Sequence, residues 1–207
     1  MSSRFCGRRR DAGFTLLEAL MVLVIVALGA GLGTVGFKRW IVHARTTEAL
    51  DMLAEISSQE QAFKAGGGRY LALRADARPQ GAALDESPGA FYPLPADSPT
   101  LASSRTPTHA DDPARWPASW RALGLRPSAR NLYCTYLVNA GEAGEAAKLP
   151  DGLPFGAALL GATPAPGPWF YALAACNLTG PGGYPDGVTV FGVSSLSGEV
   201  RTFNPGR

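Results

Sequence analysis

The first residue whose chemistry stands out is Glu18, the only charged residue between Phe14 and Phe37. An ionisable side chain in a segment that enters lipid is costly, and it marks a functional group by default. As an α-helix, residues 14–37 would be about 36 Å long, enough to cross a hydrocarbon core of roughly 30 Å. Glu18 would lie about one turn from the start of this helix. Its carboxylate could therefore reach the membrane interface or pair with a cation in apolar surroundings.

Cysteine is the second reactive residue type, with Cys6 before the apolar segment and Cys134 and Cys176 far after it. Arginines precede the segment, which favours a cytoplasmic N-terminus and places the later residues in an oxidising space. A disulfide between Cys134 and Cys176 is then expected, and the chain-entropy model assigns roughly 4 kcal/mol to such a loop. A metal site is not expected, because the chain has only two histidines and no CxxC spacing.

The chain contains residue types that hydrolases use, namely Ser194, Ser195, His109 and the Asp111–Asp112 pair. They are not part of a recognisable nucleophile elbow or metal-ligand spacing. No catalytic residues, no enzymatic activity and no cofactor are therefore expected. Residues 182–187 contain one acid, too few ligands for a calcium loop. Asn177-Leu178-Thr179 matches the N-glycosylation sequon, which is common by chance and is interpreted as a surface loop.

Charge and composition limit the remaining classes of function. Residues 1–13 carry a net charge of +3 and the rest of the chain −1, so the overall charge of +2 comes from the N-terminus. Proteins that bind nucleic acid through bulk charge need clustered cations, so no specific nucleic-acid site is expected. The 25 glycines and 17 prolines are concentrated after residue 65, which predicts a loop-rich second part.

The N-terminal residues suggest a secretory signal but differ from it in length. A conventional signal peptide has an apolar region of about 7–15 residues and a small-residue cleavage site after it. Here the apolar region is longer, and Lys38, Arg39 and Trp40 follow it. An uncut signal anchor remains as one interpretation.

The stretch Gly13-Phe14-Thr15-Leu16-Leu17-Glu18, after a short basic leader, resembles the cleavage signature of type IV prepilins, of the type IVa group. The resemblance implies that residues 1–13 form a cytoplasmic leader, which a prepilin peptidase removes between Gly13 and Phe14. The same enzyme would methylate the new amine of Phe14. The amine of an incoming subunit could then pair with Glu18 of a neighbour during assembly, whereas in an isolated monomer Glu18 could simply reach the cytoplasmic interface.

The helical pattern continues beyond the membrane segment, because residues 38–64 contain no proline or glycine. The spacing predicts an amphipathic helix over residues 38–65 that ends at Gly66-Gly67-Gly68. Its apolar face would hold Val42, Ala49, Met52 or Leu53, Ile56 and Phe63, and its opposite face Arg45, Glu48, Asp51, Glu55 and Glu60. In the membrane segment (residues 14–37), Gly29, Gly31, Gly33 and Gly36 would allow close helix packing or local unwinding.

The rest of the chain predicts a loop region and then a sheet. Residues 66–130 read as a connecting loop with a short helix near residues 115–124, whose Trp116, Trp120 and Leu123 share one face. Four strands are expected in residues 131–207, at 131–138, 169–176, 188–194 and 199–203. The predicted fold is α+β: a long N-terminal helix, half membrane-spanning and half amphipathic, packed on a four-stranded antiparallel sheet, as in pilins. The family also implies a loop bounded by the disulfide and exposed on the filament.

By this resemblance the chain is a structural subunit of a type IV pilus, serving adhesion, surface motility or DNA uptake. The alternatives are a pseudopilin of a type II secretion system, a minor pilin, or a membrane-anchored receptor domain if the leader is not cut. The implied partners are further copies in a helical filament, the prepilin peptidase and methyltransferase, the membrane, and the inner-membrane assembly machinery. The implied location is the inner membrane, with one span and a cytoplasmic N-terminus, and then a pilus at the cell surface.

Overall fold

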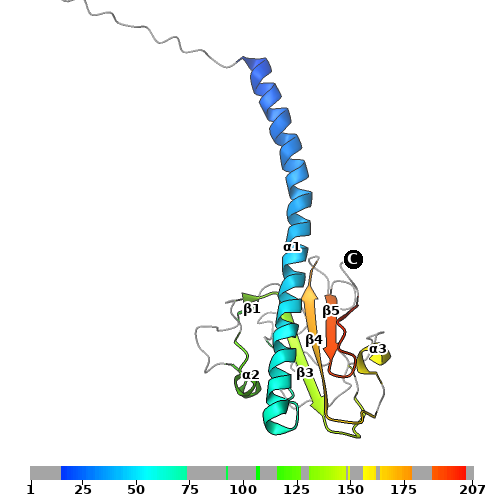
Figure 1. The fold of residues 1–207 in the computed structure, drawn as a ribbon. Coiled ribbons are helices and arrows are strands. Elements are labelled where there is room, and N and C mark those ends of the chain that lie inside the picture. Colours follow the sequence, from blue (N-terminus) through cyan, green and yellow to red (C-terminus); the bar gives the residue numbers. More distant parts are fainter. Residues whose placement is uncertain are drawn as a thin grey trace, which may run out of the picture. The chain divides into compact units, whose positions relative to one another are not determined.

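The computed structural model describes residues 15–73, 92, 106–107, 116–126, 131–147, 149, 156–161, 164–178 and 188–203 (Figure 1). The chain divides into two compact units, residues 1–40 and residues 41–207, and each is described by itself below. The predicted leader and most of residues 74–115 lie outside the described residues. So do the sequon threonine, residues 182–187, and His109, Asp111 and Asp112.

The longest element is helix α1, Leu16–Gly67. Its window Leu16–Gly33 has a mean hydropathy of 2.4 and is long and apolar enough to cross a membrane. At the other end, Gly68 adopts a left-handed conformation (φ 75°) and donates its N–H to the Lys64 carbonyl at 2.7 Å. Glycine reaches this conformation without a Cβ clash, so the predicted end at residues 66–68 is confirmed.

In the second unit, four antiparallel strands form one sheet in the order β3-β4-β5-β6. The strands are β3 Cys134–Gly141, β4 Trp169–Asn177, β5 Val188–Ser194 and β6 Arg201–Phe203. A turn at residues 195–197 joins β5 to β6, and Gly198 supplies a positive φ of 67° there. The α+β layout predicted from the sequence is therefore confirmed.

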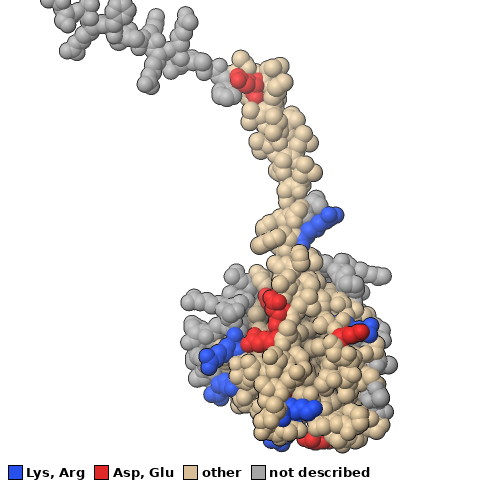
Figure 2. All heavy atoms as spheres, viewed as in Figure 1, with Lys and Arg blue, Asp and Glu red and all other residues tan. Residues whose placement is uncertain are grey.

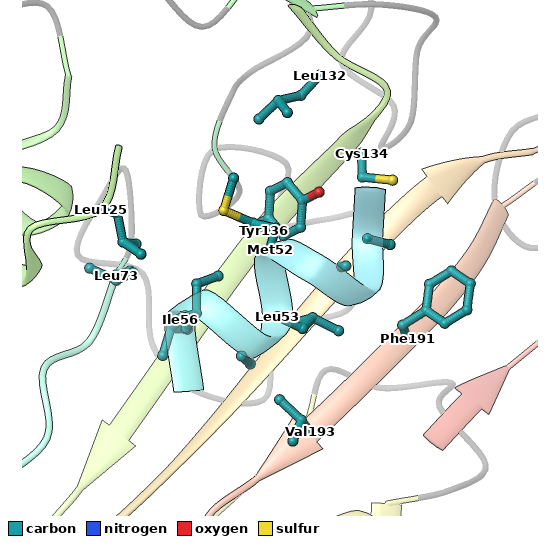
Figure 3. Packing of buried hydrophobic residues seen from close by; sticks show 14 of the residues in the cluster. Met52, Leu53, Ile56, Leu73, Leu125, Leu132, Cys134, Tyr136, Phe191 and Val193 are labelled. Carbon is teal, nitrogen blue, oxygen red and sulfur yellow. The ribbon is translucent and has the colours of Figure 1, made fainter. Parts of the chain in front are cut away.

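The part of α1 in the second unit packs on one face of this sheet (Figures 1 and 3). Ala49, Met52, Leu53 and Ile56 are buried there against the alternating residues of β4 and β5, which include Ala172, Ala174, Phe191 and Val193. Burying a leucine or isoleucine side chain stabilises a fold by roughly 1.5–3 kcal/mol. The predicted apolar face of residues 42–63 is the one that covers the sheet.

A short helix that the sequence analysis did not predict, α3 Gly156–Leu160, covers the opposite face. Leu159 packs there with Trp169, Tyr171 and Val190. Because both faces are covered, every residue of β5 is buried, which explains its nearly continuous apolar sequence. At the end of β3, Gly141 opposes Trp169 so closely that a Cβ would lie 2.4 Å from the indole ring.

The described parts of the connecting region line the edge of β3. Leu73 bridges to Val138 and Tyr92 to Tyr136. The predicted short helix is present as α2, Ala118–Leu123, which is shorter than the expected range of 115–124. Trp120 and Leu123 are buried on it, whereas Trp116 is buried but precedes the helix.

The expected strand over residues 131–138 is not continuous. Its first part, β2 (Asn131–Leu132), pairs with β1 (Thr106–Pro107). A bend at Tyr133 interrupts the strand before β3 begins. At this break the N–H groups of Tyr133 and Cys134 bind a side chain of α1, as described below.

Candidate functional site

The N-terminus of α1 places Glu18 where its carboxylate caps the helix. Its Oε2 accepts from the Thr15 N–H at 3.5 Å and from the Thr15 hydroxyl at 3.4 Å. In return, Thr15 Oγ1 accepts from the Glu18 N–H at 3.3 Å. Thr15 and Glu18 thus form a capping box with long hydrogen bonds, and the acid lies at the positive end of the helix dipole.

This capping role of Glu18 was not predicted, because the residue was interpreted only as a membrane acid. The signal was present, because Thr-x-x-Glu before an apolar run is the sequence pattern of a capping box. Gly13 and Phe14, the predicted cleavage and methylation residues, lie outside the described residues. Glu18 itself is exposed, so its carboxylate is accessible to a partner although it also caps the helix.

Beyond Glu18 the helix presents only uncharged side chains up to Phe37, which Figure 2 draws as a tan stretch. None of the window Leu16–Gly33 is buried. The helix is continuous through Gly29, Gly31, Gly33 and Gly36, and a Cβ added at any of them would meet nothing within 4 Å. Packing within one copy therefore does not require glycine at these positions.

In the second unit, Glu48 fastens α1 to the start of β3. Its Oε1 accepts from the Tyr133 N–H at 2.8 Å and from the Cys134 N–H at 3.2 Å. The Arg45 guanidinium lies 4.5 Å from the centre of the Tyr133 ring. Burial raises the pKa of Glu48, while the two N–H groups and Arg45 act in the opposite direction. Glu48 is thus half-buried and does not lie on a solvated face as predicted.

Glu60 departs further from the prediction, because its side chain is completely buried. Its Oε2 accepts from the Leu71 N–H at 2.9 Å, across the glycine turn that ends α1. Its Oε1 has no hydrogen-bond partner among the described residues. Burial raises the pKa of Glu60 to about 7, and the Leu71 N–H only partly opposes this. Placing Glu60 on the solvent face was wrong, because the carboxyl binds a backbone donor that the turn leaves unpaired inside the fold.

Cys134 and Cys176 form a disulfide, as predicted. They are directly opposed residues of β3 and β4, with Cα atoms 4.2 Å apart, and both are fully buried in the core beneath α1. The segment between them contains most of β3 and β4 together with α3. The bridge therefore joins two neighbouring strands inside the core, which differs from the expected border of an exposed loop.

Comparison with protein families gives a match at the N-terminus. Residues 8–34 match the family model described as the prokaryotic N-terminal methylation motif. The match covers the end of the predicted leader, the Gly13–Phe14 peptide bond, Glu18 and the whole apolar window. The comparisons with curated proteins and with solved structures found no match.

Proposed function

Because residues 8–34 carry the N-terminal methylation signature that type IV pilins and pseudopilins share, we propose that this chain is a structural subunit of a type IV pilus. Many copies would pack their apolar helices into a filament core and carry their sheet domains outside it. The observation that carries the proposal is Glu18, a lone acid at the start of a helical segment that is otherwise uncharged up to Phe37. Adhesion, surface motility or DNA uptake would then be properties of the filament.

The proposed assembly chemistry begins with removal of residues 1–13 by the prepilin peptidase, which also methylates Phe14. Cleavage would create a free amine on Phe14, four residues before Glu18. The capping bonds that hold Glu18 in the single copy are long, at 3.3–3.5 Å, and involve one carboxylate oxygen. An amine from a neighbouring copy could therefore bind the same carboxylate, and in a low-dielectric core such a charge-assisted contact is stronger than in water.

A pseudopilin of a type II secretion system is the second candidate, since it shares the N-terminal signature. The buried Cys134–Cys176 disulfide supports the pilin, because major pseudopilins usually lack such a bridge. A minor pilin is the third candidate. Glu18 favours an ordinary packed subunit over a tip subunit that lacks the acid.

The deciding experiment is to shear filaments from cells, identify their main subunit, and determine its N-terminus by mass spectrometry. Abundant sheared material that begins with methylated Phe14 is the expected result. It would also support the proposed route from a single span in the inner membrane, through the assembly machinery, to the cell surface. A chain that still begins at Met1, or that is absent from filaments, would contradict the proposal.

A further inference from the structure

Two exposed side chains in the sheet-bearing unit point to an interaction surface. Among the described residues of 41–207, the only exposed large hydrophobic side chains are Leu50 and Val200, which are 38% and 48% exposed. Both line one groove of about 650 Å³. Exposed apolar side chains that converge on one site mark an interaction surface more strongly than scattered ones do.

The groove has two walls. One wall is α1, which contributes Leu50, Leu53, Ala54, Ser57, Ser58 and Gln61. The other is the sheet, through Val193 of β5 and Val200 just before β6. Figure 3 shows Leu53 and Val193 on these facing elements, on the sheet face that α1 covers.

The shape and charge of the groove fit an apolar helix. From Leu50 to Gln61 the helical wall runs for about 16 Å, close to three turns of a helix lying alongside it. Ala54, Ser57 and Ser58 have small side chains on this wall, and small side chains permit close approach of another helix. No lining residue is charged, so a charged peptide would find no ionic partner there. An amphipathic or apolar helix laid in a groove is an established mode of recognition.

The chain itself contains a segment of matching chemistry. Apart from Leu50 and Val200, all of the exposed large hydrophobic side chains among the described residues lie between Leu16 and Trp40. In that stretch the window Leu16–Gly33 is entirely unburied, and after Glu18 no residue is charged until Lys38. These side chains are covered by lipid before assembly, and they need a new apolar environment once the subunit leaves the membrane.

We propose that the Leu50–Val200 groove binds the apolar helical segment Leu20–Leu32 of a second copy of this chain. The inference rests on the proposed function, because only assembly takes that segment out of lipid. It assigns the sheet-bearing unit an apolar contact in the filament in addition to the packing of the helices on one another.

A matched pair of substitutions tests the surface. Ala54 and Ala62 are both exposed on α1, but only Ala54 lines the groove. Ala54→Glu places a charge against the incoming apolar helix and should reduce the yield of sheared filaments more than about tenfold. Ala62→Glu makes the same chemical change on the same helix and should leave the yield close to that of the parent. Both variants must first be shown to be cleaved and disulfide-bonded. Equal yields from the two variants would overturn the proposal.

A cross-linking experiment identifies the occupant. Cys134 and Cys176 are bridged, so a chain that has lost Cys6 with its leader has no free thiol. Cells would express Val200→Cys together with a differently tagged copy that carries one cysteine at successive positions from Leu20 to Leu32. In sheared filaments we expect disulfide-linked pairs of the two tags, at positions that recur every three or four residues.

The outcomes separate this inference from the proposed function. Intact filaments in which Val200→Cys links only to residues 41–207 of a neighbour, links within its own chain, or forms no link would overturn the groove assignment alone. If the unmodified chain gives no filaments, the proposed function fails and the inference fails with it.

Discussion

Between residues 16–33 and residues 41–67, helix α1 keeps one backbone geometry but changes completely what its side chains do. In the first region every residue is unburied, and the single acid is exposed at the end of the helix. In the second region an apolar stripe is buried on a sheet, and two acids are drawn inward to bind backbone N–H groups. Within one copy, the first region therefore packs against nothing that buries it, whereas the second packs on the sheet of its own chain.

The change expected to affect the first region most is Glu18→Ala, which should leave synthesis and leader cleavage intact but abolish most filament assembly. Loss of the carboxylate would leave the amine of a neighbouring Phe14 unpaired in the core, at a cost of roughly 3–5 kcal/mol. The yield of sheared filaments, relative to cleaved protein in the membrane, measures the effect.

Thr15→Ala is the control for this experiment, because it removes the capping partner and keeps the acid. Loss of an N-cap costs about 1 kcal/mol, so filaments should persist. Normal assembly of Glu18→Ala would contradict the pairing. An equal loss in both variants would assign the role of Glu18 to helix capping.

In the second region the largest effect is expected from the double substitution Cys134→Ala and Cys176→Ala. The two cysteines are 42 residues apart, and opening a loop of that size lowers the free energy of unfolding by about 4 kcal/mol in the chain-entropy model. Denaturant unfolding of the full chain in detergent, followed by the signal of the buried tryptophans, measures it. Reductant should destabilise the parent and leave the double variant unchanged. Identical midpoints for the parent and the variant would contradict the prediction.

A single type of substitution made in both regions tests the contrast directly. Leu53 is 1% exposed in the core, and Leu28 is 65% exposed on the unpartnered part of the helix. Leu53→Ala should lower the free energy of unfolding by about 3 kcal/mol, because it removes buried methyl groups and leaves a cavity. Leu28→Ala should change it by less than about 0.5 kcal/mol. Similar losses from the two variants, measured on the full chain in detergent, would show that residues 16–33 are already packed within one copy.

The apolar stripe, the glycine stop and the strands were predictable because each depends on local spacing. Residues Ala49, Met52, Leu53 and Ile56 follow the helical period, and Gly66–Gly68 end the helix. The disulfide followed from the compartment and from the small number of cysteines. By contrast, the break at Tyr133 and the cover provided by α3 depend on contacts between residues far apart in the chain, which local patterns do not encode.

Glu48 and Glu60 were predicted to lie on the solvent-exposed face of the helix because both are charged. Glu60 lies four residues after Ile56 and three before Phe63, so it falls within the buried stripe by spacing alone. This spacing indicated that Glu60 is buried. Predicting its burial would have required giving the helical period more weight than the charge of the residue. Buried polar groups need hydrogen-bond partners, and here the Glu60 carboxylate accepts from the N–H of Leu71.

The buried acid of the second region also makes its stability depend on pH. The folded-state pKa of Glu60 is about 7, above its ordinary value of 4.5, so the folded protein holds this proton more tightly than the unfolded chain does. The stabilisation is therefore complete below about pH 4.5 and is lost as the pH rises from there through about 7, for a total of roughly 3 kcal/mol.

Glu60→Gln isolates this contribution, because the amide oxygen can still accept from Leu71 but the side chain cannot ionise. The variant should match the parent near pH 4.5 and exceed it in unfolding free energy at pH 8, as measured by denaturant titrations of the full chain at both pH values. Since all other titrating groups are common to both proteins, only the difference between the two curves counts. Parallel curves from pH 4.5 to 8 would mean that Glu60 is solvated like an ordinary surface acid. The contrast between an exposed acid in the first region and a buried one in the second would then be lost.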